Sequence, residues 1–419
     1  MEIIEHKKKA LVLAGGTPQI ALIKELQRRG YFVLLADYNE NPVAKAYCDR
    51  YYQVSTLDVP AIRKISEEEN VSFLITVCTD QALLTVAQVS EELGLPCYID
   101  YQTALNVTNK KYMKELFAEK DIPTAKFVLL EKLDPEKVKG LSYPLISKPV
   151  DCNSSKGVKK STNFDELSEN FEEAKALSRS GLVVVEEFIE GKEISVDVYV
   201  DNGTAVLLDT SSLQKIDKKD SFVIFRGIGP IVRDENNRKK ITEIAQKIAD
   251  AFHITDSPML IQMLVRDGEY YVIEFSARTG GGGKFLRIIE DAGFDPIKAV
   301  VDLTEGRKPD VAISLNKIVD LLEFIYCYPG TYDHIEGFEA LKAAGIIKHP
   351  MVFKTKGAKF DTIKNSGDRI AGYMIIGNSV EEVEAKREIA NKGFKVVDEN
   401  GVDIARHDIL KMSPDYQWL

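Results

Sequence analysis

Cysteine and long apolar runs are both scarce in this sequence. Five cysteines are scattered over 419 residues, with no CxxC pair and no spacing typical of a zinc site. Their odd number and wide separation indicate reduced thiols rather than a disulfide framework. No apolar run approaches membrane-spanning length, and residues 1–10 lack the apolar region and cleavage site of a signal peptide. We therefore expect a soluble cytoplasmic protein with no membrane partner.

Positive charge is in deficit. The chain has 55 lysines and arginines against 65 aspartates and glutamates, a formal net charge of −10. A general nucleic-acid binder needs a basic face, so we expect no nucleic-acid partner. A pocket for a small anion must instead be built from specific lysines and arginines.

Several catalytic patterns are missing as well. No GxxxxGK[ST] sequence is present, which excludes a Walker-type nucleotide site by pattern. The five histidines are dispersed, and no Ser-His-Asp or Cys-His arrangement is evident. We also find no internal repeat and no low-complexity tract.

The first hundred residues alternate short apolar strands with amphipathic helices. This rhythm predicts a parallel sheet covered by helices on both faces. The loop Ala14–Gln19 lies where a dinucleotide fold keeps its phosphate loop, but it is not GxGxxG. Two interpretations stay open with equal weight: a substrate- or phosphate-contacting loop at a helix N-terminus, and a tight strand–helix turn. Binding of NAD ranks below both. The expected strands are 10–14, 32–36, 72–77 and 96–99, and the expected helices are 20–29, 61–69 and 82–93.

The following segment contains one predicted helix, from Asn106 to about Lys120, and then a series of strands. The strand 193–200 alternates with Ile194, Val196, Val198 and Val200 on one face. From about residue 312 onward the pattern mixes strands with a helix and predicts a small α+β unit. The other expected elements are strands 143–150, 158–161, 182–189, 259–265 and 270–275, with helices 164–178, 237–252 and 380–392.

Four motifs contain the candidate functional residues, and the order of the motifs along the chain is more specific than any one of them. They are Asn-Lys-Lys at 109–111 closed by Ile-Pro at 122–123, Tyr-Pro-x-x-x-Lys-Pro at 143–149, Val-Glu-Glu-Phe-Ile-x-Gly-x-Glu at 185–193, and Ile-Glu-x-x-x-Arg at 273–278. In this order they resemble the ATP-grasp superfamily over roughly residues 8–310. The Glu-x-x-x-Arg stretch also resembles that of bacterial L-amino-acid ligases, and the chain shares features with carbamoyl-phosphate-synthetase-like domains.

The resemblance implies a protein with α/β and α+β parts. A parallel α/β pre-ATP-grasp domain would cover residues 1–100. An ATP-grasp domain of two α+β subdomains would cover 101–311, with its lid subdomain at about 124–186. A small C-terminal α+β unit, 312–419, would complete the ATP-grasp core. This unit either closes over the pocket or forms a contact in a homodimer, and both alternatives stay open.

By the same resemblance, Lys110 and Lys148 contact the phosphates of ATP. Compact ammonium groups suit phosphate oxygens. Lys148 lies inside an apolar strand, where a lysine is unusual, and this favours a functional role. The turn containing Ser154, Ser155 and Gly157 would cover the phosphates, with an ordinary hairpin turn as the alternative.

The resemblance also assigns the adenosine contacts to the third motif. Glu186 would lie near the exocyclic amine of adenine, while Glu187, Phe188 and Ile189 supply contacts from the same connection. Glu193 matches the carboxylate that accepts hydrogen bonds from the ribose.

Magnesium, with manganese as an alternative, would bind near the fourth motif. Magnesium prefers oxygen ligands and bridges nucleotide phosphates. Glu274 matches the family's central ligand, and Gln262 and Ser276 stand where the family usually has acidic and Asn ligands.

Three further sites concern the substrate. Arg278 would stabilise charge on the transferred phosphoryl group. Backbone amides of Gly281 and Gly282, in the run 280–283, would face an anion ahead of a helix starting near Lys284. Arg226 could hold a carboxylate by a bidentate contact, with a surface ion pair as the alternative.

These assignments imply an ATP-dependent carboxylate–amine ligase that forms an amide or peptide bond through an acyl phosphate and releases ADP and phosphate. Its partners would be a small carboxylate, such as an amino acid, and an amine. Two alternatives remain: a purine-pathway or carbamoyl-phosphate-synthetase-like enzyme, and a nucleotide-binding regulatory protein that has lost turnover.

Overall fold

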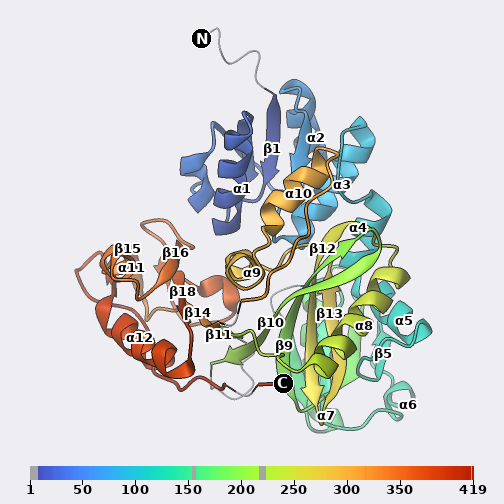
Figure 1. Ribbon diagram of the computed structural model, residues 1–419. Coiled ribbons are helices and arrows are strands. Elements are labelled where there is room, and N and C mark those ends of the chain that lie inside the picture. The colour runs from blue at the N-terminus through green and yellow to red at the C-terminus, as the bar shows by residue number, and fades with distance from the viewer. Residues whose placement is uncertain (1–7, 153–156, 217–222, 317, 417) are drawn as a thin grey trace.

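The computed structural model describes residues 8–419 except 153–156, 217–222, 317 and 417. Its N-terminal part contains a four-stranded parallel sheet in the order β3-β2-β1-β4 (Figure 1). The βα rhythm predicted a parallel sheet, but the strand β3 was not among the expected strands. Along β1, Ala10 and Val12 pack into one apolar cluster and Leu11 and Leu13 into another, so both faces of the sheet are covered. The elements of this part are β1 (Lys9–Leu13), α1 (Thr17–Arg28), β2 (Phe32–Asp37), the short 3-10 helix η1 (Val43–Tyr47), β3 (Arg50–Gln53), α2 (Val59–Glu68), β4 (Phe73–Ile75) and α3 (Asp80–Leu93).

Two sequence predictions in this region are wrong. The expected strand 96–99 lies in no sheet. The single helix expected from Asn106 to about Lys120 is two helices, α4 (Tyr101–Thr108) and α5 (Lys110–Glu119). Asn109 is extended and its side chain accepts from the Tyr112 N–H at 3.2 Å, so it ends one helix and caps the next. The break makes Lys110 the first residue of a helix.

A second sheet has four strands in the order β5-β8-β6-β7 and is called the lid sheet below, because it lies in the range expected for the lid. Helix α7 covers one face, where Leu167, Phe171 and Ala174 pack against Val183 and Val185 of β8. The other face is turned toward the rest of the molecule and carries the side chains described below. The lid elements are β5 (Phe127–Leu130), α6 (Pro135–Val138), β6 (Leu145–Pro149), β7 (Lys159–Ser161), α7 (Phe164–Leu177) and β8 (Val183–Glu187).

The largest sheet has eight strands in the order β13-β12-β9-β10-β11-β14-β18-β16. The predicted alternation of β9 is confirmed: Ile194, Val196, Val198 and Val200 are buried in the cluster that α8 covers. Strands β14, β18 and β16 continue this sheet, so the C-terminal part shares one sheet with the strands before it. The elements are β9 (Lys192–Asp201), β10 (Thr204–Lys215), β11 (Ile224–Gly229), α8 (Glu235–Ala251), β12 (Ser257–Arg266), β13 (Glu269–Ser276), β14 (Val319–Ile325), β16 (Lys348–Val352) and β18 (Ala371–Gly377).

The remaining C-terminal elements pack on the far end of that sheet (Figure 1). A three-stranded sheet in the order β17-β15-β19 lies there with α11 and α12. No helix among the described residues has both the length and the apolar character to cross a bilayer. The elements are β15 (Gly330–Glu336), α11 (Phe338–Ala343), β17 (Lys359–Phe360), η2 (Ser366–Asp368), α12 (Val380–Gly393), β19 (Lys395–Asp398) and α13 (His407–Leu410).

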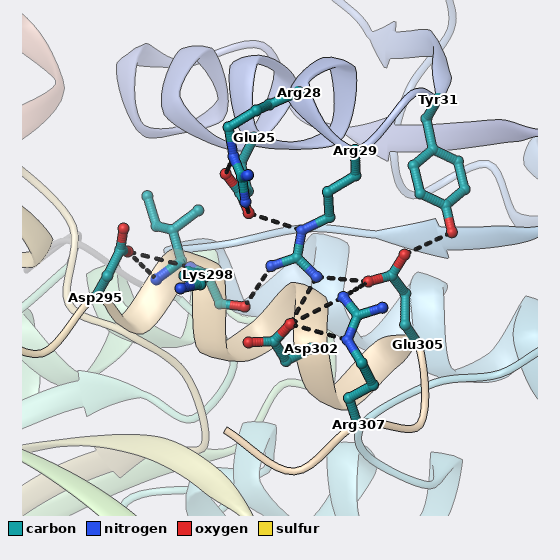
Figure 2. A network of polar contacts seen from close by, with 10 residues as sticks. Glu25, Arg28, Arg29, Tyr31, Asp295, Lys298, Asp302, Glu305 and Arg307 are labelled. Atoms are coloured by element: carbon teal, nitrogen blue, oxygen red, sulfur yellow. Dashed lines mark hydrogen bonds and ion pairs between the residues drawn. The ribbon is translucent and has the colours of Figure 1, made fainter. Parts of the chain in front are cut away.

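A polar network fastens the N-terminal sheet to helices that come much later in the chain (Figure 2). Arg29 donates to Glu25 and to Asp302, each at 2.7 Å, and Tyr31 donates to Glu305 at 2.7 Å. The Arg29 side chain is only 8% exposed, so these bonds form largely out of water. The two late helices, α9 (Lys284–Ala292) and α10 (Pro296–Thr304), also add Phe285, Ile297 and Val300 to the N-terminal core. The polar contacts therefore hold α10 against the N-terminal part, and the packing of Phe285 holds the start of α9 there.

Candidate active site

Two adjoining cavities lie between these sheets. The first cavity is enclosed by the lid sheet, α5 and the strands β12 and β13. The second cavity lies between the carboxyl end of β4, the glycine run before α9 and the C-terminal part of the large sheet. Gln262 and Glu274 line both cavities, so the two meet at these side chains.

A buried carboxylate in the first cavity is shared by two lysines. Glu186 lies 2.7 Å from the Lys114 ammonium and 2.5 Å from the Lys148 ammonium. All three side chains are nearly out of contact with water. Burial alone would raise the pKa of Glu186, but the two ammonium groups outweigh burial and lower it to about 2. Burial lowers the pKa of Lys114 in spite of that carboxylate. Two cations and one anion therefore leave a net positive charge on the wall of the cavity.

Lys114 is a residue that the sequence prediction did not select. It lies four residues after Lys110, on the same face of α5, and it is 2% exposed. A lysine at a buried position of an amphipathic helix was the available signal. The structure thus brings three lysines to the first cavity: Lys110, Lys114 and Lys148.

Of the residues that the resemblance assigns to adenosine, Glu186 is held between the two lysines. The others also line this cavity: Glu187, Phe188, Ile189 and Glu193. Glu193 pairs with Lys215 at 2.5 Å, a lysine that the sequence prediction did not name. The Phe188 N–H donates to Pro144 O at 2.8 Å. The Phe188 amide therefore already forms a hydrogen bond to the backbone before β6. The Glu187 side chain accepts from the Ser142 N–H at 2.9 Å. Ile189, 6% exposed, completes the apolar end of the cavity.

The loop expected to cover the phosphates is described only in part. Ser154 and Ser155 lie outside the described residues. Gly157 has φ +75°, and a Cβ atom there would stand 2.8 Å from Leu177 and 3.0 Å from Pro149. Only glycine fits this position without strain, so Gly157 shapes the turn that follows β6.

The expected metal residues share one face of the large sheet. Gln262 pairs directly with Glu274 across β12 and β13, and Ser276 follows two residues later on the same face. One Glu274 oxygen lies 3.2 Å from the Lys110 ammonium. Carboxylate and amide oxygens are donors that magnesium accepts, so Glu274 and Gln262 fit a single ion that also binds nucleotide phosphates. No group of three or more histidine, cysteine, aspartate or glutamate side chains in the described part of the chain could hold a metal by itself.

Arg278 is held by a residue from the N-terminal sheet. Its guanidinium donates to both carboxylate oxygens of Asp80, at 2.7 and 2.6 Å. Burial alone would raise the pKa of Asp80, and Arg278 lowers it instead. Ser276 also hydrogen-bonds to Asp80 and adds to this lowering. Asp80 opens α3 at the carboxyl end of β4, where parallel sheets place ligand-contacting residues. The sequence prediction missed it because its partner is 198 residues away.

Arg226 is not available to a substrate, which corrects the sequence prediction. Its side chain is completely buried and forms an ion pair with Glu323 at 2.8 Å. Its other nitrogens donate to Gln214 and to the carbonyls of Met412 and Leu410. Every nitrogen of this buried guanidinium is occupied, and its contacts hold strand β11 against strand β14 and against the C-terminal tail. Arg226 lines neither cavity.

The glycine run 280–283 is tightly packed and is not a linker. Gly281 and Gly282 line the second cavity, as expected for substrate contacts. A Cβ atom on Gly280 would stand 2.4 Å from the Lys284 side chain, and one on Gly282 would stand 3.0 Å from Phe324. The run therefore lets Lys284 enter the cavity at the start of α9.

The N-terminal loop Ala14–Gln19 is a strand–helix turn whose groups are occupied. The Gly15 N–H donates to Asp37 at 2.7 Å and the Gln19 side chain donates to Val77 O at 2.7 Å. Neither cavity includes the loop. The structure favours the second of the two interpretations left open above.

The described residues thus form a lysine-lined cavity between two antiparallel sheets, which meets a second cavity at a carboxylate. In comparison with known proteins, residues 141–285 match the family model described as "ATP-grasp domain".

Two relatives match most of the chain. Phosphoribosylamine–glycine ligase of Caldanaerobacter subterraneus is 24% identical over 94% of this chain and 97% of that protein. L-arginine-specific L-amino acid ligase of Bacillus subtilis is 23% identical over 73% of this chain and 76% of that protein. The crystal structure of L-amino acid ligase from Bacillus licheniformis superposes with a TM-score of 0.77 at 21% identity, covering 94% of this chain and 99% of the other. The structural match shows the same fold, and the relatives support an ADP-forming ligase that makes a carbon–nitrogen bond.

Proposed function

We propose that this protein uses ATP to activate a small carboxylate as an acyl phosphate and then joins it to an amine. The observation that carries the proposal is the meeting of the two cavities at Glu274, which lines both. A nucleotide in the first cavity and a carboxylate in the second cavity would face each other there. The expected cytoplasmic location and the small-molecule partners belong to the same proposal.

The lysines of the first cavity bind the phosphates. Lys110, Lys114 and Lys148 enter it from two different elements, α5 and β6, so they can hold several phosphate oxygens at once. Glu186 fixes two of these ammonium groups before any nucleotide arrives. Pre-positioned charges cost little reorganisation when the substrate binds. Glu193 and Ile189, at the other end, take the ribose and the base.

Magnesium fits beside Glu274 and Gln262, with manganese as a substitute. When bound, it neutralises phosphate charge and orients the γ-phosphate. Lys110, 3.2 Å from Glu274, keeps that carboxylate directed toward the junction of the cavities.

The chemistry itself needs positioning more than a reactive side chain. A carboxylate oxygen of the substrate attacks the γ-phosphorus, the bond from that phosphorus to the bridging oxygen breaks, and ADP leaves. The amine nitrogen then attacks the acyl carbon, phosphate leaves, and the nitrogen loses a proton to solvent. Arg278, oriented by Asp80, stabilises the negative charge that develops in both steps.

The carboxylate in this proposal belongs to an amino acid. The two relatives named above join an amino acid to a second molecule by the wording of their names, glycine in one case and an L-amino acid in the other. Purine-pathway ligation remains the second candidate because the first of these relatives matches nearly the whole chain.

The test is ADP release by the purified chain with ATP, magnesium and pairs of amino acids or amines. We expect release with at least one pair and none without a carboxylate. The variant Lys64→Ala changes a side chain that is 73% exposed on α2 and serves as the control. A chain that binds ATP but releases no ADP with any pair would support the regulatory alternative instead.

A further inference from the structure

The second cavity contains an arginine with no acidic partner among the described residues. Arg369 follows η2 and donates to the Tyr326 hydroxyl at 3.1 Å, to Ile224 O at 2.9 Å and to the Ser366 hydroxyl at 3.2 Å. All three acceptors are neutral. The guanidinium also lies over the ring of Phe324, 3.7 Å from its centroid.

This arrangement differs from that of three other arginines that lie largely out of water near the site. Each of the three has a carboxylate within ion-pair distance: Arg226 has Glu323, Arg278 has Asp80, and Arg287 has Asp209 and Asp320. Arg179, which also lines the second cavity, is exposed, and its side chain donates to the Asp151 carbonyl. A cation taken out of water without a counter-charge is costly unless a ligand supplies that charge. Burial accordingly lowers the pKa of Arg369, and no carboxylate acts in the opposite direction.

Nε and Nη2 of this guanidinium donate to the three neutral groups, so Nη1 is the nitrogen without an acceptor among the described residues. A Cβ atom on Gly282 would stand 3.1 Å from Nη1 of Arg369, so the absence of a side chain at Gly282 keeps that nitrogen open. Arg369, Ser366, Phe324 and Gly282 all line the second cavity. The N–H bonds of Nη1 and the Ser366 hydroxyl beside them suit the oxygens of an anion.

The reacting carboxylate has other partners. It must lie close to Glu274 and Arg278, where the γ-phosphate arrives, and Arg278 is directed by Asp80 from the N-terminal part of the molecule. Arg369 belongs to a different wall, built by the C-terminal part around Phe324 and Tyr326. Lys284 adds a second ammonium to this cavity, held by Ser195 and 3.9 Å from Asp197. Arg278 and Lys284 thus have carboxylates beside them, while Arg369 keeps a positive charge that no described carboxylate balances at ion-pair distance.

We propose that Arg369 binds a second anionic group of the substrate, so that the substrate is a carboxylate bearing a further carboxylate or a phosphate monoester. This inference rests on the proposed function, since it names the substrate class of the same site. Arg369 acts as the specificity-determining contact, and Gly282 keeps it accessible.

The first experiment measures anion binding and needs no turnover. Inorganic phosphate and glutarate are titrated calorimetrically into the chain with saturating ADP and magnesium, which occupy the first cavity. We expect wild type and Arg63→Gln, a change on an arginine 50% exposed on α2, to bind at least one of them. We expect Arg369→Gln to lose that binding and Arg369→Lys to recover part of it. Equal binding by wild type and Arg369→Gln, or no binding by wild type, would overturn the inference.

The second experiment compares matched substrates by ADP release: glutamate with glutamine, aspartate with asparagine, and phosphoserine with serine. We expect an acidic member to be preferred, and Arg369→Gln to lower its kcat/KM roughly 10- to 100-fold while changing the neutral member and the ATP requirement little. The pairs also separate a carboxylate from a phosphate. A preference for neutral members in wild type would overturn the inference while leaving the ligase proposal intact. If ADP is released in the absence of any substrate, that result would count against the ligase proposal alone. The anion titration would still test Arg369, because it does not depend on turnover.

Discussion

Replacing Glu186 by glutamine removes the carboxylate that Lys114 and Lys148 share. Both ammonium groups would then be buried with a neutral amide between them, and each lies within 2.7 Å of the replaced group. The pKa of Glu186 falls from an ordinary 4.5 to about 2, and that difference corresponds to about 3 kcal/mol of stability. Breaking a buried ion pair by removing one partner costs a similar amount, about 3–5 kcal/mol. We therefore expect Glu186→Gln to destabilise the lid by about 3 kcal/mol at pH 7.

The free energy of unfolding should depend on pH in a direction that follows from the lowered pKa of Glu186. A carboxylate whose pKa is lowered in the folded state contributes fully above its unfolded value, near pH 4.5, and loses the contribution as pH falls toward 2. The difference in unfolding free energy between wild type and Glu186→Gln should therefore be large at pH 7 and shrink between about pH 4.5 and 2. Urea unfolding followed by circular dichroism at several pH values measures this difference. Hydrogen exchange of the β8 amides shows whether the loss of stability lies in the lid. The control Glu67→Gln changes a half-exposed surface pair and should cost under about 0.5 kcal/mol. Equal stability of wild type and Glu186→Gln at pH 7 would refute the reasoning.

Two further predictions concern the proposed reaction. Lys148→Ala should raise the ATP concentration for half-maximal ADP release about tenfold or more, because a phosphate contact is lost; an unchanged ATP titration would remove Lys148 from the nucleotide site. Asp80→Asn should lower kcat about tenfold with little change in the ATP requirement, because Arg278 loses the charge that orients it. Single-turnover kinetics measures this effect, and a change confined to the ATP requirement would contradict the positioning role.

The sequence predicted the parts of the fold that have a local signal. The alternation in 193–200 and the apolar runs of the first hundred residues translate directly into β9 and the parallel sheet. Lys148 stood out because it interrupts an apolar strand, and Glu274 because of its motif. The break at Asn109 was missed since the apolar periodicity continues across it, although Asn is a favoured helix cap.

Contacts between distant residues could not be predicted in the same way. Arg226 and Arg369 look alike in the sequence, yet Arg226 meets Glu323, which lies 97 residues away, while Arg369 meets only neutral groups. Asp80 approaches Arg278 only because α9 and α10 are fastened to the N-terminal sheet. The partner of a charged side chain decides its role, and the tertiary fold supplies that partner.

Glu274 joins the two cavities, so its replacement is the most direct test of the ligase proposal. ADP release with magnesium, ATP and the most active substrate pair should be measured for wild type and Glu274→Ala, with circular dichroism to confirm that the fold is retained. The side chain is 35% exposed, so its loss should cost little stability. We expect Glu274→Ala to be folded and to show no measurable turnover, because the magnesium ion that would balance the charge of the transferred phosphoryl group loses its carboxylate ligand. Turnover near the wild-type rate would contradict the proposed site.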